Sequence, residues 1–164
     1  MNTENSRGVY VENEQQLEKF GCQLSSYLQP GNLILLHGPL GTGKSALARA
    51  MIRKILDQPN LEVPSPTFLL ALPYQNQHIS ILHADLYRIE SENEVEELCL
   101  FEDDNSIVFV EWPERLPFLF QQADLLIKIG FASKKAGRNL EISAPTGLEQ
   151  FAKLKELCLL PACE

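Results

Sequence analysis

The feature that most constrains the fold is a glycine-rich segment after the first apolar run. Residues 38–45 read Gly-Pro-Leu-Gly-Thr-Gly-Lys-Ser, which fits the P-loop pattern G-x-x-x-x-G-K-S. Residues 32–36, just before it, are too few for a helix and predict a buried strand, whereas residues 46–56 are rich in helix formers. Strand, glycine loop and helix in this order are the context in which the pattern binds nucleotide phosphates.

The residue types in this segment suit a triphosphate. Gly41 and Gly43 let successive backbone N–H groups turn inwards, so that the loop and the helix N-terminus face the phosphates. Lys44 is placed to bridge the β and γ phosphates, and the hydroxyl of Ser45 to bind Mg²⁺. The sequence has no N-K-x-D and no D-x-x-G motif of Ras-like GTPases, so ATP is the expected nucleotide by elimination.

Two acidic residues end apolar segments and are candidates for binding the metal and for ordering the attacking water. Glu111 follows the run 107–110 and is the first choice for a Walker B carboxylate, the alternative being the solvated end of a strand. Asp85 ends the segment 79–84 and is expected to order the attacking water, the alternative being a helix or turn cap. Thr67, in the proline-rich loop 63–67, is placed to reach the γ phosphate; a structural turn explains the same residues.

The remaining pattern predicts an α/β fold with three layers and a mixed, partly parallel sheet, formed by residues 1–164 as a single P-loop ATPase domain. Further strands are expected at 8–12, 68–72 and 79–85, and as a hairpin of 124–130 with 139–143. Helices are expected at 13–28, where Asn13 and Gln16 resemble a capping box, from Ser91, and at 147–160.

Composition narrows the class of protein. The chain has 14 Lys plus Arg against 22 Asp plus Glu, a net charge of −8, which disfavours binding to nucleic acid by this chain alone. No apolar run approaches the roughly 18 residues that a membrane span needs, and the first residues do not resemble a signal peptide. We therefore expect a cytoplasmic protein that does not bind membranes. The four cysteines contain no C-x-x-C pair and are expected to be reduced thiols.

Four segments in order carry a more specific signal than the P-loop alone: GPLGTGKS at 38–45, SPTF at 65–68, HADLYR at 83–88 and VEWPERL at 110–116. Together they resemble the TsaE (YjeE) family, bacterial P-loop ATPases required for threonylcarbamoyladenosine formation on tRNA. The resemblance covers roughly residues 10 to 145.

The resemblance implies roles for individual residues. Ser45 and Glu111 would bind Mg²⁺, Thr67 would belong to a switch-like segment, and Asp85 would be needed for activity. The catalytic set would then be Lys44, Thr67, Asp85 and Glu111. The residues holding the nucleotide would be Leu40, Gly41, Thr42, Gly43, Lys44, Ser45 and Ala46, joined by looser analogy by Glu14 and Arg138. Trp112 would pack beside the nucleotide, or equally serve as a core residue.

The chain departs from the family pattern at two P-loop positions. The family usually has Asp after the first glycine and Thr after the lysine, where this chain has Pro39 and Ser45. Ser45 keeps the metal-binding hydroxyl, whereas Pro39 removes a backbone N–H and a carboxylate.

The family's role also implies partners. They are TsaD and TsaB, which modify adenosine 37 of tRNA, so tRNA would be met through that complex. ATP hydrolysis by this chain would reset the pair between cycles. Two other functions fit the same P-loop: a small-molecule kinase of the shikimate type, and a nucleotide-gated adaptor with negligible hydrolysis.

Overall fold

One seven-stranded sheet organises the chain. The computed structural model describes residues 6–91, 93–94, 98–133 and 136–146. The strands are β1 (Ser6–Val11), β2 (Leu33–His37), β3 (Ala71–Gln75), β4 (Ser80–Asp85), β5 (Ile107–Glu111), β6 (Leu125–Phe131) and β7 (Arg138–Ser143). The helices are α1 (Glu14–Leu24), α2 (Lys44–Leu56) and the short α4 (Leu119–Gln122), with 3-10 turns η2 (Ser25–Tyr27) and η3 (Pro113–Arg115).

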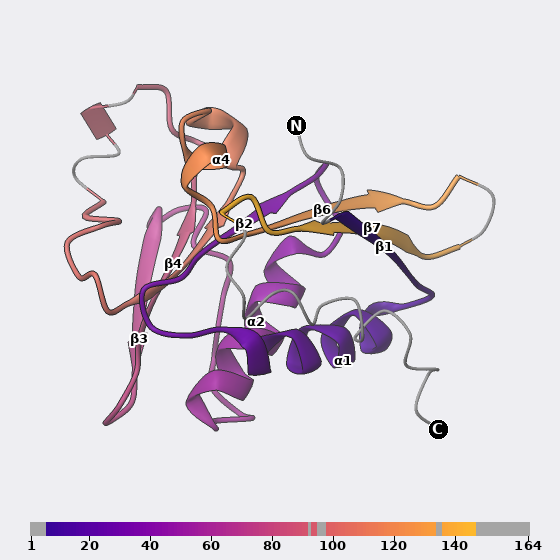
Figure 1. The fold of residues 1–164 in the computed structure, drawn as a ribbon, viewed down its shortest axis with the longest axis horizontal. Helices are drawn as coiled ribbons and strands as arrows, with labels where there is room; N and C mark the ends of the chain where they lie inside the picture. The colour runs from indigo at the N-terminus through magenta and orange to yellow at the C-terminus, as the bar shows by residue number, and fades with distance from the viewer. Residues whose placement is uncertain (1–5, 92, 95–97, 134–135, 147–164) are drawn as a thin grey trace.

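The sheet is parallel at its centre and antiparallel at both edges. Its strand order is β1-β7-β6-β2-β5-β4-β3 (Figure 1). Strands β6, β2, β5 and β4 run parallel, whereas the β3–β4, β6–β7 and β1–β7 pairs are antiparallel. Helices α1 and α2 cover one face and α4 lies on the other. The predicted α/β fold with a mixed, partly parallel sheet is confirmed.

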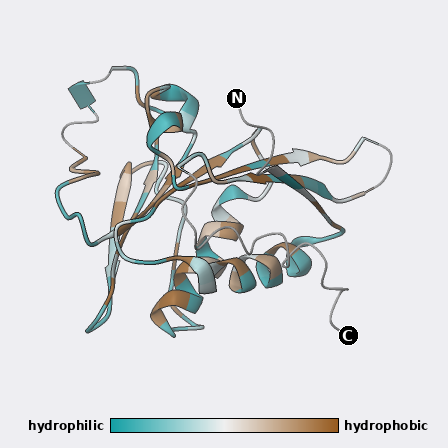
Figure 2. Ribbon diagram, viewed as in Figure 1, coloured by the Kyte–Doolittle hydropathy of each residue, from teal (hydrophilic) through white to brown (hydrophobic). Residues whose placement is uncertain are grey.

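The central strand β2 is buried on both faces, as a strand inside a parallel sheet must be. Ile34 and Leu36 pack into the cluster beneath α1 and α2, while Leu33 and Leu35 pack into the cluster beneath α4. Each such side chain contributes about 1.5–3 kcal/mol of transfer free energy. Figure 2 shows the strands mainly in apolar colours and both polar and apolar residues on α1 and α2. The strand is thereby fixed as a rigid base for the loop that follows it.

The first helix begins where the sequence predicts and ends earlier. The side chain of Asn13 caps α1, since its Oδ1 accepts a hydrogen bond from the Gln16 N–H at 3.0 Å. The Gln16 side chain accepts from the Glu12 N–H at 2.8 Å, so the reciprocal half of a capping box, which would reach Asn13, is replaced by a contact one residue earlier. The α-helix stops at Leu24 and the chain continues as η2.

The prediction of a strand at 68–72 is wrong in its first half. Phe68 and Leu69 are 83% and 68% exposed and belong to a turn, in which the Leu70 N–H donates to Pro66 O. Leu70 has a left-handed φ of 64°, which a strand does not allow. Strand β3 therefore begins only at Ala71, and apolar character at 68–69 is a property of the surface.

The other predicted elements appear with small changes in their ends. Strand β1 corresponds to 8–12, β5 to 107–110, and β6 with β7 to the later hairpin. The Ser91 hydroxyl donates to Glu94 Oε1 at 2.8 Å, and residues 93 and 94 are helical. The rest of that short helix and the predicted helix 147–160 lie outside the described residues. Helix α4 was not expected from the sequence.

Candidate functional site

The carboxyl ends of the central parallel strands meet at one edge of the sheet. Strand β2 ends at His37 and leads into the P-loop, β4 ends at Asp85, and β5 ends at Glu111. Asp85 stands opposite Glu111 in the β4–β5 register, and Leu36 stands opposite Glu111 in the β2–β5 register. In open α/β sheets ligands bind at this edge, where side chains from different strands converge. The two predicted carboxylates and the P-loop are therefore neighbours.

The P-loop has the backbone conformation that its glycines permit. Gly41 and Gly43 have φ of 78° and 103°, in the left-handed region, and Gly43 immediately precedes α2. A Cβ placed on Gly41 would meet no atom within 4 Å, so this side of the loop is open. The buried Thr42 braces the loop from inside, where its Oγ1 donates to Pro39 O at 2.9 Å. Leu40 is exposed on the loop and Ala46 is buried in α2. The open face leaves backbone N–H groups and a helix N-terminus available to an anion.

Lys44 is held by the loop itself. Its Nζ donates to Gly38 O at 2.6 Å and Pro39 O at 2.9 Å, and lies 4.0 Å from the centre of the Trp112 ring. Burial lowers the pKa of the Lys44 ammonium, an effect that the carboxylates of Glu111, Glu114 and Asp85 oppose. An anion close to the ammonium would further favour its charged form.

Trp112 reaches Lys44 through an unusual backbone. Its φ of 58° lies in the left-handed region, which costs a residue other than glycine about 1 kcal/mol or more. This turn follows β5 directly, and the Trp112 N–H donates to Leu36 O at 3.3 Å. The indole also contacts the Tyr87 ring, with the centroids 4.8 Å apart. Trp112 thus covers Lys44 at the end of two neighbouring strands.

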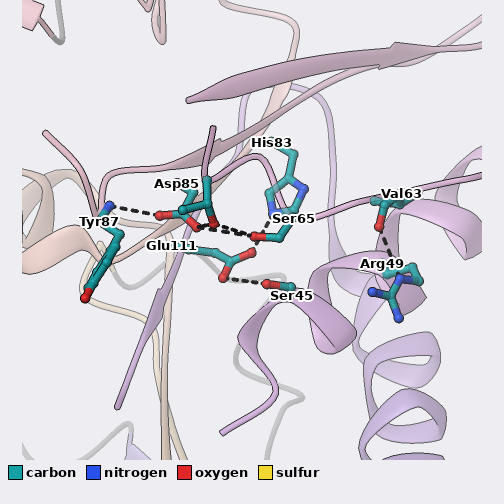
Figure 3. Close-up of polar contacts among 9 residues, drawn as sticks. Ser45, Arg49, Val63, Ser65, His83, Asp85, Tyr87 and Glu111 are labelled. Carbon is teal, nitrogen blue, oxygen red and sulfur yellow. Dashed lines mark hydrogen bonds and ion pairs between the residues drawn. The ribbon is translucent and has the colours of Figure 1, made fainter. Parts of the chain in front are cut away.

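Glu111 is buried and bound on both oxygens. Its Oε2 accepts a hydrogen bond from the Ser45 hydroxyl at 2.9 Å, which joins the end of β5 to the first turn of α2. Its Oε1 lies 2.8 Å from His83 Nε2 (Figure 3). Only 2% of the Glu111 side chain is exposed. A hydroxyl and a carboxylate oxygen this close are the kind of donors that Mg²⁺ takes in nucleotide sites, which it completes with phosphate oxygens and water. The residues present therefore fit a magnesium ion.

Asp85 is bound by a different part of the chain. Its Oδ2 accepts from Thr67 Oγ1 at 2.7 Å and from Ser65 Oγ at 3.4 Å, and its Oδ1 accepts from the Tyr87 N–H at 2.8 Å. The hydroxyls of Ser65 and Thr67 are themselves 2.8 Å apart. The loop 63–67 is thus closed onto the end of β4 (Figure 3).

Two arginines of α2 anchor the chain that leads into this loop. The Arg49 Nε–H donates to Val63 O at 3.1 Å, and the Arg53 Nε–H donates to Leu61 O at 2.8 Å. Arg49 lies one turn after Ser45 on the same helix, so one helix contacts both the Glu111 carboxylate and the stem of the loop that contacts Asp85.

A family model establishes where this arrangement belongs. The model described as "Threonylcarbamoyl adenosine biosynthesis protein TsaE" matches residues 11–140, a range that contains the P-loop, Thr67, Asp85 and Glu111. The chain belongs to the TsaE family. The expected family is thereby confirmed.

Curated relatives carry the name tRNA threonylcarbamoyladenosine biosynthesis protein TsaE. A Haemophilus influenzae relative is 32% identical over 146 residues, covering 85% of this chain and 90% of its own. Relatives from Rickettsia bellii and Synechocystis are each 34% identical, over 110 and 127 residues; these cover 66% and 73% of this chain and 76% and 78% of the relatives. The crystal structure of Bacillus subtilis YdiB superposes with a TM-score of 0.69 at 21% identity and covers 93% of each chain, a similarity of fold.

Of the two residues assigned by looser analogy to TsaE proteins, Arg138 lies beside the P-loop and Glu14 lies at the start of α1. Arg138 begins β7 next to Gly43: a Cβ on that glycine would come within 3.5 Å of the Arg138 Nε, which is buried and has no hydrogen-bond partner among the described residues. Glu14 is exposed at the start of α1, one turn before Leu17, whose side chain also abuts Gly43.

Three polar residues of the site were missed by reasoning from sequence. The sequence pattern alone assigns no site role to His83, Ser65 or Arg49. The alternation of β4 puts His83 and Asp85 on one face, which is the signal that could have placed His83 near Glu111.

Two absences hold for residues 6–91, 93–94, 98–133 and 136–146. No three His, Cys, Asp or Glu side chains within them are grouped to hold a metal ion without other ligands. None of the helices in the same ranges has the length and apolar character to cross a membrane.

Proposed function

We propose that this chain binds ATP with Mg²⁺ and hydrolyses it in the biosynthesis of threonylcarbamoyladenosine on tRNA. The observation that carries the proposal is the 2.9 Å hydrogen bond between Ser45 and the buried Glu111 at the start of the P-loop helix. This pair provides the hydroxyl and carboxylate that a P-loop enzyme uses for its metal. Curated relatives of the chain are named for this biosynthesis.

The chain's own groups would divide the work. Backbone N–H groups of residues 40–46 and the N-terminus of α2 hold the phosphates. Lys44 exchanges its two loop carbonyls for the β and γ phosphates, and the charge on those oxygens offsets the cost of its burial. Arg138 and Glu14 border the nucleotide next to Gly43. Ser45 and Glu111 would hold Mg²⁺, which when bound would supply positive charge that neutralises the phosphates.

Asp85 and Thr67 would orient the attacking water molecule. The Asp85 carboxylate accepts the Thr67 hydroxyl at 2.7 Å, so both groups are held at the end of the strand next to Glu111. When Thr67 turns towards a γ phosphate, the Asp85 oxygen that it leaves becomes free to accept a hydrogen bond from a water molecule. Closure of the loop over ATP and orientation of the water are then one event.

The partners of this activity would be TsaD and TsaB, with tRNA bound through them. A net charge of −8 agrees with a chain that leaves the contact with tRNA to other proteins. By hydrolysing ATP, this chain resets the TsaD–TsaB pair; it does not itself transfer the threonylcarbamoyl group.

Turnover of ATP tests the proposal. It is measured for the chain alone and with TsaD, TsaB and tRNA, with Glu111→Ala and Asp85→Ala as controls. Turnover should rise with the partners and be lost in both variants. Activity that ignores the partners, transfer of phosphate to a small alcohol, or unchanged turnover in the variants would contradict it.

A further inference from the structure

His83 is a polar residue in a place where an apolar one would pack. It lies within β4 with no exposed surface, and its Nδ1 has no hydrogen-bond partner among the described residues. Leaving a buried polar atom unpaired is energetically unfavourable. Its single polar contact there is the 2.8 Å bond between Nε2 and Glu111 Oε1. The hydrogen bond to Glu111 therefore offsets the free-energy cost of burying a histidine at this position.

The register explains why the two side chains meet. His83 stands opposite Phe109, and Asp85 stands opposite Glu111, so His83 and Glu111 are diagonal neighbours on one face of adjacent strands. A carboxylate accepts, so the proton of this bond is on Nε2. Oε1 is thereby occupied by the histidine, and Oε2 is the oxygen that faces Ser45 and α2. Figure 3 shows Glu111 between His83 and Ser45.

We propose that His83 is a positioning residue for magnesium: its Nε2–H fixes the Glu111 carboxylate so that Oε2 points at the Ser45 hydroxyl. The inference rests on the proposed function, in which these two residues hold the ion. Hydrogen bonds to metal-binding side chains set their orientation, and their loss typically costs 10–100-fold in metal affinity or activity. Without His83, no described residue would hold Oε1, and the carboxylate could rotate away from Ser45.

Two variants separate positioning from packing. His83→Leu introduces an apolar side chain of similar reach and removes the donor, while His83→Gln presents an amide N–H at a position similar to Nε2. The readout is ATP affinity by calorimetry, with Mg²⁺ and with EDTA, beside thermal unfolding. In His83→Leu, the gain in ATP affinity that Mg²⁺ provides is expected to be about tenfold smaller, while the affinity in EDTA stays the same. His83→Gln is expected to retain the gain.

The outcomes distinguish the two proposals. If the unaltered chain gains no ATP affinity from Mg²⁺, the proposed function and this inference both fail. If it gains affinity and His83→Leu gains the same, only the inference fails, and His83 is a packing residue. In a Glu111→Ala background, His83→Leu should have no further effect, because its action passes through Glu111.

A measurement on the unaltered chain covers the case in which His83→Leu does not fold. The chain has three histidines, so ¹⁵N labelling of their rings gives few signals, and His37 and His78 serve as internal references. Adding Mg²⁺ to the chain bound to a non-hydrolysable ATP analogue is expected to shift the His83 Nε2 resonance. A His83 signal that does not move, or moves no more than those of His37 and His78, would overturn the inference.

Discussion

Glu111 and Asp85 stand opposite each other on two adjacent parallel strands, yet different parts of the chain hold them. Glu111 is bound by Ser45 on α2 and by His83 within the sheet, both in rigid elements. Asp85 is bound by Thr67 and Ser65 of a loop and by the Tyr87 N–H of the turn that follows it. One carboxylate is thus built into the framework, while the other depends on a segment without regular structure.

The difference suggests a division of roles. A group that binds a metal benefits from a fixed position, whereas a group that must admit water and respond to a phosphate benefits from a partner that can leave. The following variants test whether the two neighbouring carboxylates are separable in this way.

Glu111→Gln is expected to have the largest effect. The amide keeps the size of the side chain and removes the charge that would bind the metal, so turnover should fall by about 100–1,000-fold, the scale of a lost electrostatic contact at a reacting centre. The gain in ATP affinity from Mg²⁺ should vanish as well. Calorimetry with and without Mg²⁺, beside a turnover assay, measures both quantities. A Gln variant that keeps this gain would place the metal elsewhere.

Asp85→Asn should lower turnover by about 100-fold, as expected for loss of a group that orients and accepts a proton from water. Unlike Glu111→Gln, it should leave the affinity for ATP with Mg²⁺ unchanged, because Asp85 acts on the other reactant. The same two assays apply. If Asp85→Asn removes the dependence on Mg²⁺ instead, the roles of the two carboxylates are exchanged.

Thr67→Val should have a smaller effect, about tenfold on turnover, in line with the loss of one hydrogen bond to a charged group. Ser65→Ala is its matched control, since the Ser65 contact with Asp85 is 3.4 Å long against 2.7 Å for Thr67. Steady-state kinetics at saturating ATP compares them. Equal losses in the two variants would mean that the loop acts as a whole and that Thr67 has no particular role.

Arg49→Gln is expected to change turnover least, by a few-fold, through loss of the bond to Val63 O that fixes the stem of the loop. Arg53→Gln removes an equivalent bond to Leu61 O one turn further along α2. Both should make residues 57–66 easier to cleave in limited proteolysis, but only Arg49→Gln should affect turnover. An equal kinetic effect of Arg53→Gln would assign both arginines to stability alone.

The framework side of this comparison was easier to predict from sequence than the loop side. The strand, the loop and the helix of this side are each determined by residues that are close in sequence. These are the run 32–36, the glycines and Lys44. The strand prediction at 68–72 was wrong because Phe68 and Leu69 are apolar but lie in a surface turn. Leu70 has a left-handed φ there, and its N–H donates to Pro66 O. Local pattern does not distinguish an apolar turn from a buried strand.

Side-chain contacts between neighbouring strands could not be predicted from the sequence. The bond between His83 and Glu111 joins residues 28 positions apart and depends on which residues stand opposite in β4 and β5. Only register supplies that information, and register is set by packing of the whole sheet. For the same reason, Thr67 and Asp85 were each assigned to the site, but the bond between them was not foreseen.

The most direct test of the division is to locate the metal. Crystals of the chain with a non-hydrolysable ATP analogue and Mn²⁺, which gives an anomalous signal, would show the ion itself. This division of roles predicts one peak about 2.0–2.1 Å from Ser45 Oγ, the distance typical of magnesium, with Glu111 bound to the ion directly or through one water. A peak held by Asp85 and Thr67, with Ser45 and Glu111 still bonded to each other, would contradict it.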